Sequence, residues 1–166
     1  EGNESTIEDM YQAMGELDAL IAVASFRESL PYYSQPEFVE ANGREGASLK
    51  VEKLYHPLID DPVANSIQMQ RGVLITGSNA SGKSTFLKTI AINTILAQTV
   101  HTCIAKHYCG SFMKVLTSMA LRDNLSGGES YYMVEIRSLK RILEECEKPE
   151  PVLCIVDEVL RGTNTI

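Results

Sequence analysis

Residues 72–85 read GVLITGSNASGKST, and this stretch decides the fold of the chain. Its first part, residues 73–76, is a short apolar run that predicts a buried strand. A loop follows that matches the pattern G-x-x-x-x-G-K-[ST], ending in Lys83 and Ser84. Strand, glycine-rich loop and helix in this order are typical of a Walker A phosphate loop. The stretch therefore predicts a nucleotide-binding site.

The composition of the loop follows from the chemistry of phosphate binding. Gly77 allows a sharp turn out of the strand, and Gly82 allows backbone N–H groups to approach phosphate oxygens. The positive end of the helix that starts near Lys83 adds to this anion site. We expect Lys83 to reach the β- and γ-phosphates and Ser84 to place its hydroxyl on Mg²⁺. The predicted ATP-binding residues of the loop are Gly77, Ser78, Asn79, Ala80, Ser81, Gly82, Lys83, Ser84 and Thr85.

The apolar run VLCIV at residues 152–156 ends on Asp157 and Glu158, which is the pattern of a Walker B strand. A carboxylate at the end of a central strand can hold Mg²⁺, and a second one beside it can polarise the attacking water. We assign the metal role to Asp157, together with Ser84, and the role of catalytic base to Glu158. The alternative is an acidic turn that follows a strand.

A second glycine-rich loop, DNLSGGES at residues 123–130, comes just before a helical pattern. Because a helix N-terminus favours anions, Gly128 and Ser130 mark a second potential anion site. The alternative is that the residues S-G-G form an ordinary N-capping turn. The phosphate loop already provides a cradle of its own. Two anion sites for one triphosphate therefore suggest a site that a second subunit shares.

The N-terminal residues form a long amphipathic helical pattern. Ser5 and Glu8 form a capping box, and apolar side chains then recur in alternating steps of three and four. Because Pro31 disfavours helical geometry in the residue before it, the helix is expected to end by Leu30. The narrow stripe fits a short coiled coil or a helix that lies across a domain surface. The second is favoured, because so few heptads rarely stand alone.

Residues 32–70 form short segments separated by proline and glycine, and residues 47–54 alternate like a half-buried strand. We expect a small β-rich lead-in to the strand of the phosphate loop. Tyr55, His56 or Val63 could lie against a nucleotide base, although side chains in such a segment are more often simply packed. Val63 is retained as a candidate nucleotide-binding residue.

Composition narrows the class of protein. The 166 residues carry a formal charge of −7, which argues against direct contact with a nucleic-acid backbone. No apolar run is long enough to span a bilayer, and the acidic N-terminus differs from a signal peptide, so we expect a cytoplasmic protein without membrane contact. The four cysteines lack a C-x-x-C pair and are expected to be packed structural residues. The spacing of His101 and His107 does not support a metal site.

These motifs together resemble the ATPase domain of the MutS family, DNA mismatch repair proteins and their relatives. DNLSGGESYYMVE from position 123 is similar to the family signature, and DEVLRGTNT from position 157 is similar to its Walker B segment. YHPLI from position 55, VAN from position 63 and LDALIAVASF from position 17 resemble further elements of the family. GSNASGKST replaces the usual GPNMGGKST, so the chain is identified as a divergent member.

The resemblance implies an α/β fold of the P-loop NTPase class, with a mostly parallel sheet flanked by helices as in ABC-type ATPases. It implies that residues 1–31 are the end of a lever region and that residues 32–166 are the N-terminal portion of the ATPase domain, truncated after Walker B. The strand that follows Walker B in such folds lies beside the phosphate-loop strand. Since that neighbour would be missing, we expect little activity from the segment alone.

The resemblance further implies that ATP hydrolysis with Mg²⁺ drives a dimeric clamp on DNA, which is held by domains outside this segment. Asn79, Lys83, Ser84, Asp157 and Glu158 would act within one subunit of a homodimer. Ser130 would act across the interface, on the γ-phosphate bound by the partner.

Two other functions fit part of the sequence. Residues 125–129 read LSGGE, close to the signature of ABC ATPases in transporters and chromosome-maintenance proteins. However, Leu125 lies 32 residues before Asp157, a longer spacing than ABC signatures usually have before Walker B. The letters R-G-T after Asp-Glu are also typical of the MutS family, so both features favour that family. A non-catalytic nucleotide-dependent interaction module is the third hypothesis, and Glu158 argues against it.

Overall fold

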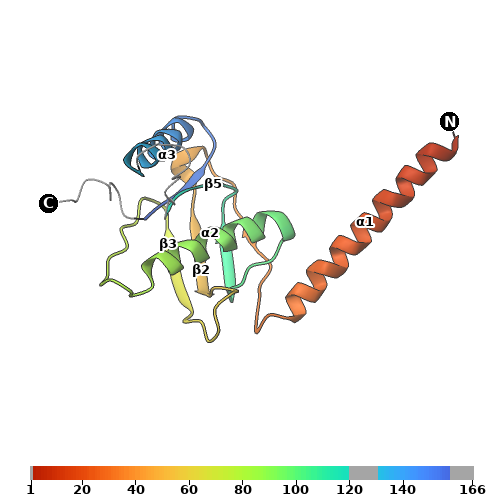
Figure 1. The fold of residues 1–166 in the computed structure, drawn as a ribbon, viewed down its shortest axis with the longest axis horizontal. Coiled ribbons are helices and arrows are strands. Elements are labelled where there is room, and N and C mark those ends of the chain that lie inside the picture. The colour runs from red at the N-terminus through yellow and green to blue at the C-terminus, as the bar shows by residue number, and fades with distance from the viewer. Residues whose placement is uncertain (1, 120–130, 158–166) are drawn as a thin grey trace.

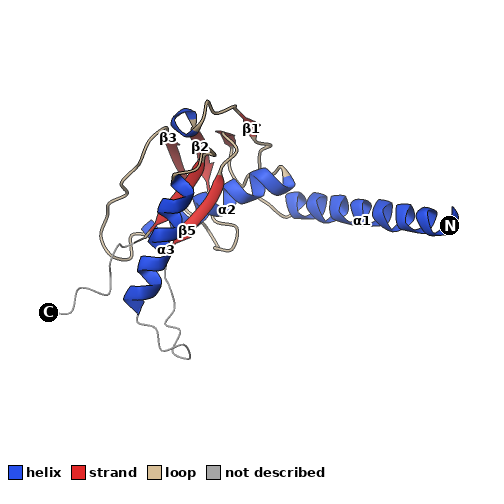
Figure 2. Ribbon diagram, turned by 90° about the horizontal axis from the view of Figure 1, so that it is seen from above, coloured by secondary structure: helices blue, strands red, loops and turns tan. Residues whose placement is uncertain are grey.

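The computed structural model describes residues 2–119 and 131–157 (Figure 1). Its helices are α1 (Gly2–Glu28), α2 (Lys83–Val100) and α3 (Tyr131–Cys146), with a 3-10 turn at Arg44–Gly46. Its strands are β1 (Glu37–Phe38), β2 (Leu49–Leu54), β3 (Asn65–Met69), β4 (His107–Gly110), β5 (Lys114–Ser118) and β6 (Val152–Val156). Two small sheets and two helices form a compact body, and α1 projects away from it (Figures 1 and 2).

The described strands form a mixed arrangement, so the prediction of a mostly parallel sheet is wrong. The larger sheet has the order β1-β4-β2-β3, in which β2 pairs antiparallel with both β3 and β4 and only β1–β4 is parallel. In the smaller sheet β5 and β6 pair in parallel. The β2–β3 connection, residues 55–64, is too short for the crossover that parallel neighbours need, so these strands run in opposite directions.

The strand predicted at residues 73–76 is also absent from the described structure. Residues 72–78 form no ladder, and the side chains of Val73 and Leu74 are 51% and 88% exposed. A cleft of 290 Å³ lies between this segment and β6, lined by Val73 and Ile75 on one side and by Leu153 and Ile155 on the other. An apolar run becomes a strand only where a neighbour pairs with its backbone groups, and none of the described residues does so.

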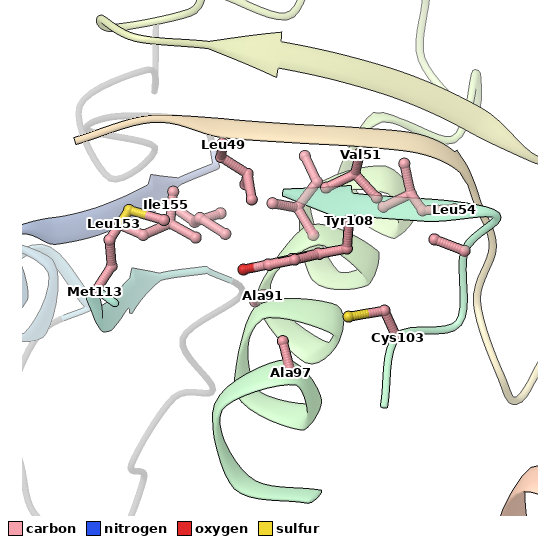
Figure 3. Packing of buried hydrophobic residues seen from close by; sticks show 12 residues of the cluster. Leu49, Val51, Leu54, Ala91, Ala97, Cys103, Tyr108, Met113, Leu153 and Ile155 are labelled. Carbon is pink, nitrogen blue, oxygen red and sulfur yellow. The ribbon is translucent and has the colours of Figure 1, made fainter. Parts of the chain in front are cut away.

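The hydrophobic core joins both sheets through α2. Leu49, Val51 and Leu54 of β2 are each 1% exposed and point toward α2, together with Tyr108 of β4 (Figure 3). Leu153 and Ile155 of β6 enter the same cluster from the other sheet. The alternating burial of β2 confirms the half-buried strand predicted at residues 47–54. This cluster fixes α2, and with it the end of the phosphate loop.

Asn93 is a polar residue at the centre of α2, and it is fully buried. Its Oδ1 accepts a hydrogen bond of 2.7 Å from the backbone N–H of Ile104, and its Nδ2 donates one of 3.0 Å to the carbonyl of Thr89. Both polar ends of the amide are therefore satisfied. The side chain ties the segment that follows α2 back onto the helix.

The helix predicted at the N-terminus is confirmed as α1, but it begins at Gly2, so the predicted capping box of Ser5 and Glu8 lies inside the helix and is wrong. The surroundings of α1 also differ from the prediction. Five apolar side chains of its stripe are between 52% and 64% exposed, namely Ile7, Met10, Met14, Leu17 and Ile21. None of the described elements covers this stripe, whereas we expected it to lie across a domain surface. A narrow apolar stripe indicates that one face of a helix packs against another segment. It does not indicate which segment that is.

Arg27, in the last turn of α1, holds this helix to the C-terminal end of α2. Its guanidinium donates to Thr102 Oγ1 at 2.8 Å and to the His101 carbonyl at 3.0 Å, and it lies 5.5 Å from the ring centre of Tyr33. A cation at the C-terminal end of a helix also complements the helix dipole. The attachment of α1 to the body includes these polar contacts, and the apolar Val23 and Phe26 in the same part of the helix are half-buried.

Candidate phosphate-binding site

Lys83 is the first residue of α2, and its side chain folds back over the loop. Its Nζ donates to the carbonyl oxygens of Gly77 and Ser78, both at 2.8 Å. These two carbonyls hold the ammonium group at the mouth of the loop, where it is half-buried. An entering anion with strong acceptor oxygens would compete for the same ammonium group, because hydrogen bonds between two charged groups are the stronger ones.

The backbone of the loop adopts conformations that favour glycine at two positions. Gly82 has φ of 88°, in the left-handed region, and a Cβ on Gly77 would approach Ser81 Oγ to 2.8 Å. Ala80 also has a positive φ, of 62°, which costs an L-residue conformational energy. The backbone conformation therefore favours glycine at Gly82, whereas the neighbour at Gly77 is a serine hydroxyl that can rotate away.

The N-terminus of α2 is open to an anion. Its N-cap residue, Gly82, offers no side-chain hydrogen bond to the first turn, and the first turn contains no acidic residue. A hollow of about 500 Å³ lies at this end of the helix. It is lined by Asn79, Ala80, Ser81, Gly82, Lys83, Ser84 and Thr85. Free N–H groups, the helix dipole and an ammonium group converge here, which is the arrangement that binds phosphate.

The structure brings together all the predicted loop residues but does not complete the predicted metal site. Asp157 follows β6 directly, is half-buried, and donates its backbone N–H to the carbonyl of Ser118 at 3.0 Å. It is not among the residues that line the hollow of the loop. Ser84 lies in the first turn of α2. A hydroxyl and a carboxylate are suitable ligands for Mg²⁺, so their joint role stays a prediction.

Three predicted residues, Glu158, Gly128 and Ser130, lie outside the described residues. The helix predicted after the second glycine-rich loop is confirmed as α3, which begins at Tyr131. The strand predicted before Glu158 is confirmed as β6, with the predicted bounds. In the described part of the chain, no three side chains of His, Cys, Asp or Glu gather in a way that could hold a metal ion.

The candidates for contact with a nucleotide base have different surroundings. Tyr55 is 5% exposed, packs on the ring of Tyr32 with centroids 4.7 Å apart, and donates its hydroxyl to the Tyr32 carbonyl at 2.8 Å. It is a packed residue, as the alternative interpretation stated. His56 accepts a hydrogen bond from the backbone N–H of Leu58 through Nδ1. Val63 is 82% exposed and is accessible to a ligand.

Two side-chain contacts in the structure were not predicted from the sequence. One is the link from Arg27 to the end of α2. The other joins Cys146 and Cys154, whose sulfurs lie 3.3 Å apart. The sequence gives only weak indications of these two contacts. A basic residue in the last turn of a helix, or a cysteine before a proline-rich turn, does not identify the residue that it will contact. In both cases the contact depends on how α1 or α3 is placed against another element.

Comparison with known proteins shows which family and which proteins this chain resembles. Residues 73–166 match the family description MutS domain V. The chain is 33% identical to DNA mismatch repair protein msh3 of Aspergillus fumigatus, over 98% of this chain and 15% of that protein. It is 33% identical to DNA mismatch repair protein MutS of Haloquadratum walsbyi, over 97% of this chain and 17% of that protein. For DNA mismatch repair protein MutS of Thermosipho melanesiensis the identity is 32%, over 96% and 19% respectively.

Proposed function

The chain belongs to the MutS family, and from this premise we propose that it binds ATP with Mg²⁺ as part of an ABC-type ATPase domain. It spans less than a fifth of the length of the three relatives above, so the activity of the whole protein is part of the same proposal. The observation that carries the proposal is the phosphate loop, with its open helix N-terminus and the ammonium group of Lys83 at its mouth.

The roles of the residues follow from their positions. Backbone N–H groups of residues 77–85 and Lys83 bind the phosphates. Ser84 and Asp157 would hold the metal ion, which would neutralise charge on the phosphates. Glu158, next to Asp157, polarises the water that attacks the γ-phosphate. Val63 contacts the base. Each of these steps uses a residue of a single chain.

The remaining step needs a second copy of the protein. In a homodimer, Ser130 of one subunit donates to the γ-phosphate held by the loop of the other, so hydrolysis is linked to the approach of the two ATPase domains. The names of the relatives support a role in DNA mismatch repair, in which this cycle moves a clamp on DNA. Domains outside residues 1–166 hold the DNA, in agreement with the net charge of −7.

The location of the protein is proposed from composition alone. We place it in the cytoplasm, without membrane contact by this segment. Among the described helices, none has the length and apolar character needed to cross a membrane.

Substitution of Lys83 tests the proposal directly. Lys83→Ala removes the cation at the mouth of the loop and should weaken the binding of a fluorescent ATP analogue to the full-length protein by at least roughly tenfold. The matched control is Lys88→Ala, an exposed lysine further along α2, which should leave the affinity unchanged. Equal affinity of the Lys83→Ala protein and the wild type, with α2 intact by circular dichroism, would refute the assignment.

A further inference from the structure

Cys146 and Cys154 bring two thiols together where α3 meets β6. Cys146 is the last residue of α3, Cys154 is the central residue of β6, and their Sγ atoms are 3.3 Å apart. Both side chains are half-buried, and Cys154 lines the cleft of 290 Å³ between β6 and residues 72–75. The pair is therefore close enough to react together, and a small molecule in the cleft can reach it.

Ion pairs hold this end of α3 in place. Glu145, next to Cys146, contacts Lys114 Nζ at 2.6 Å and Lys148 Nζ at 2.7 Å. Hydrogen bonds from these two lysines lower the pKa of Glu145 to about 2, so the carboxylate is charged at neutral pH. Because Lys114 lies on β5, which pairs with β6, the ion pair positions α3 against the sheet that carries Cys154.

We propose that Cys146 and Cys154 form a redox-sensitive dithiol, which a small peroxide converts into a disulfide that joins α3 to β6. A disulfide needs its sulfurs about 2 Å apart, so the two atoms must approach by a little over 1 Å. The last residue of a helix can make such an adjustment by side-chain rotation, with little change in the strand. A thiol reductant reverses the reaction.

The chemistry requires one oxidant and proceeds in two steps. The thiolate of one cysteine of the pair attacks one oxygen of hydrogen peroxide, the O–O bond breaks, and a sulfenic acid and hydroxide result. The thiol of the other cysteine then attacks the sulfenic sulfur, the S–S bond forms, and water leaves with the thiol proton. Both sulfurs are oxidised and the peroxide is reduced to two molecules of water. Either cysteine can attack first, because both side chains are half-buried and the same disulfide results.

The disulfide would connect two elements that lead into predicted catalytic segments. α3 begins after the glycine-rich loop at residues 123–130, and β6 ends at Asp157. Fixing the end of α3 to β6 restricts movement between these segments. An effect on ATP turnover rests on the proposed function, whereas formation of the disulfide does not.

The test is peroxide treatment of the full-length protein, followed by digestion and mass spectrometry without reductant. Cleavage after glutamate, at Glu147, separates the two cysteines, whereas trypsin leaves them in one peptide because Pro149 follows Lys148. The expected product is a pair of linked peptides that lack two hydrogen atoms and separate on reduction. Cys146→Ser should abolish the product, and Cys109→Ser, which removes another half-buried cysteine, should leave its yield unchanged.

Two results would overturn the proposal. One is peroxide treatment that oxidises Cys109 while Cys146 and Cys154 remain unlinked. The other is an equal yield of Cys154-containing disulfide in the Cys146→Ser protein, which would show nonspecific pairing. Circular dichroism verifies that the serine variants are folded, and serine is close to cysteine in size. Because the readout is a covalent link, absence of the linked peptides in the peroxide-treated wild-type protein would disprove the dithiol. Loss of ATP binding in Lys83→Ala tests the proposed function separately.

Discussion

The helices α1 and α2 both carry many apolar side chains, yet they meet opposite surroundings. α2 contacts β2 of one sheet and β5 of the other, and its residues Ile90, Ala91 and Ala97 belong to the core. α1 is longer, with 27 residues against 18, but its apolar stripe is exposed along most of its length. Apolar spacing therefore creates a face for burial, whereas stability comes from the surface that covers this face.

Two leucine substitutions should show the largest contrast between the two regions. Leu54→Ala removes a side chain that is 1% exposed in the core and should lower the free energy of unfolding by about 2–5 kcal/mol. Leu17→Ala, in a side chain of α1 that is 60% exposed, should change it by less than about 0.5 kcal/mol. Urea unfolding of this segment measures both. A comparable loss in the two variants would mean that α1 is covered in solution.

Substitution of Asn93, whose amide is buried in α2, should have the next largest effect on the free energy of unfolding. Asn93→Ala leaves the N–H of Ile104 without its acceptor in the core and should cost about 1–3 kcal/mol. Thr99→Ala is the matched control, because this threonine lies on the exposed side of α2 and bonds only the carbonyl one turn back. Urea unfolding again gives the values. An Asn93→Ala protein as stable as the Thr99→Ala protein would show that Ile104 finds another acceptor.

The link between the two helices should contribute less to stability than to orientation. Arg27→Ala removes the hydrogen bonds to Thr102 and His101 and should reduce the free energy of unfolding by about 1 kcal/mol. The distance between spin labels at Asp9 and Thr99 should spread over a wider range, because little else in the described chain holds α1. Arg27→Lys keeps the charge but not the geometry of the guanidinium, so it should restore the distance only in part. An unchanged narrow distance in Arg27→Ala would locate the attachment elsewhere.

The smallest effect concerns the exposed ion pairs of Glu145 at the end of α3. Its pKa is lowered to about 2 from an ordinary value of 4.5, so the stabilising contribution is present above pH 4.5 and is lost as the pH falls toward 2. In Glu145→Gln this part of the acid dependence should disappear. Denaturation midpoints measured across this pH range test it, with Glu144→Gln as the neighbouring control. Identical acid dependence in the wild type and Glu145→Gln would show that solvent screens the pairs.

Local patterns predicted the elements that depend on local geometry. The loop for which we propose phosphate binding could be predicted because its glycines, lysine and helix start lie within nine residues, and the left-handed φ of Gly82 agrees with this local pattern. The bounds of β6 and the start of α2 followed from the same kind of signal. For Ser130 and Glu158 the structure adds no test, since they lie outside the described residues.

Pairing between strands could not be predicted in this way. The run at residues 73–76 has the composition of a buried strand, but a short run contains no information on whether a partner strand lies beside it. The direction of β2 relative to β4 likewise depends on the path of the chain through α2, which separates them in sequence. β4 and β5 follow α2 in a mixed segment without clear periodicity. They are strands because β4 pairs with β1 and β2, and β5 pairs with β6.

Residues that are near neighbours in the chain were sufficient to indicate the family, the main helices and the loop for which we propose phosphate binding, because each of these depends on a local pattern. Only the tertiary structure decided that Tyr55 is packed, that Arg27 reaches the end of α2 and that Cys146 meets Cys154. These contacts join residues from different elements, up to 75 positions apart. Their formation depends on how the elements pack, and a side chain's own identity does not specify its distant neighbour.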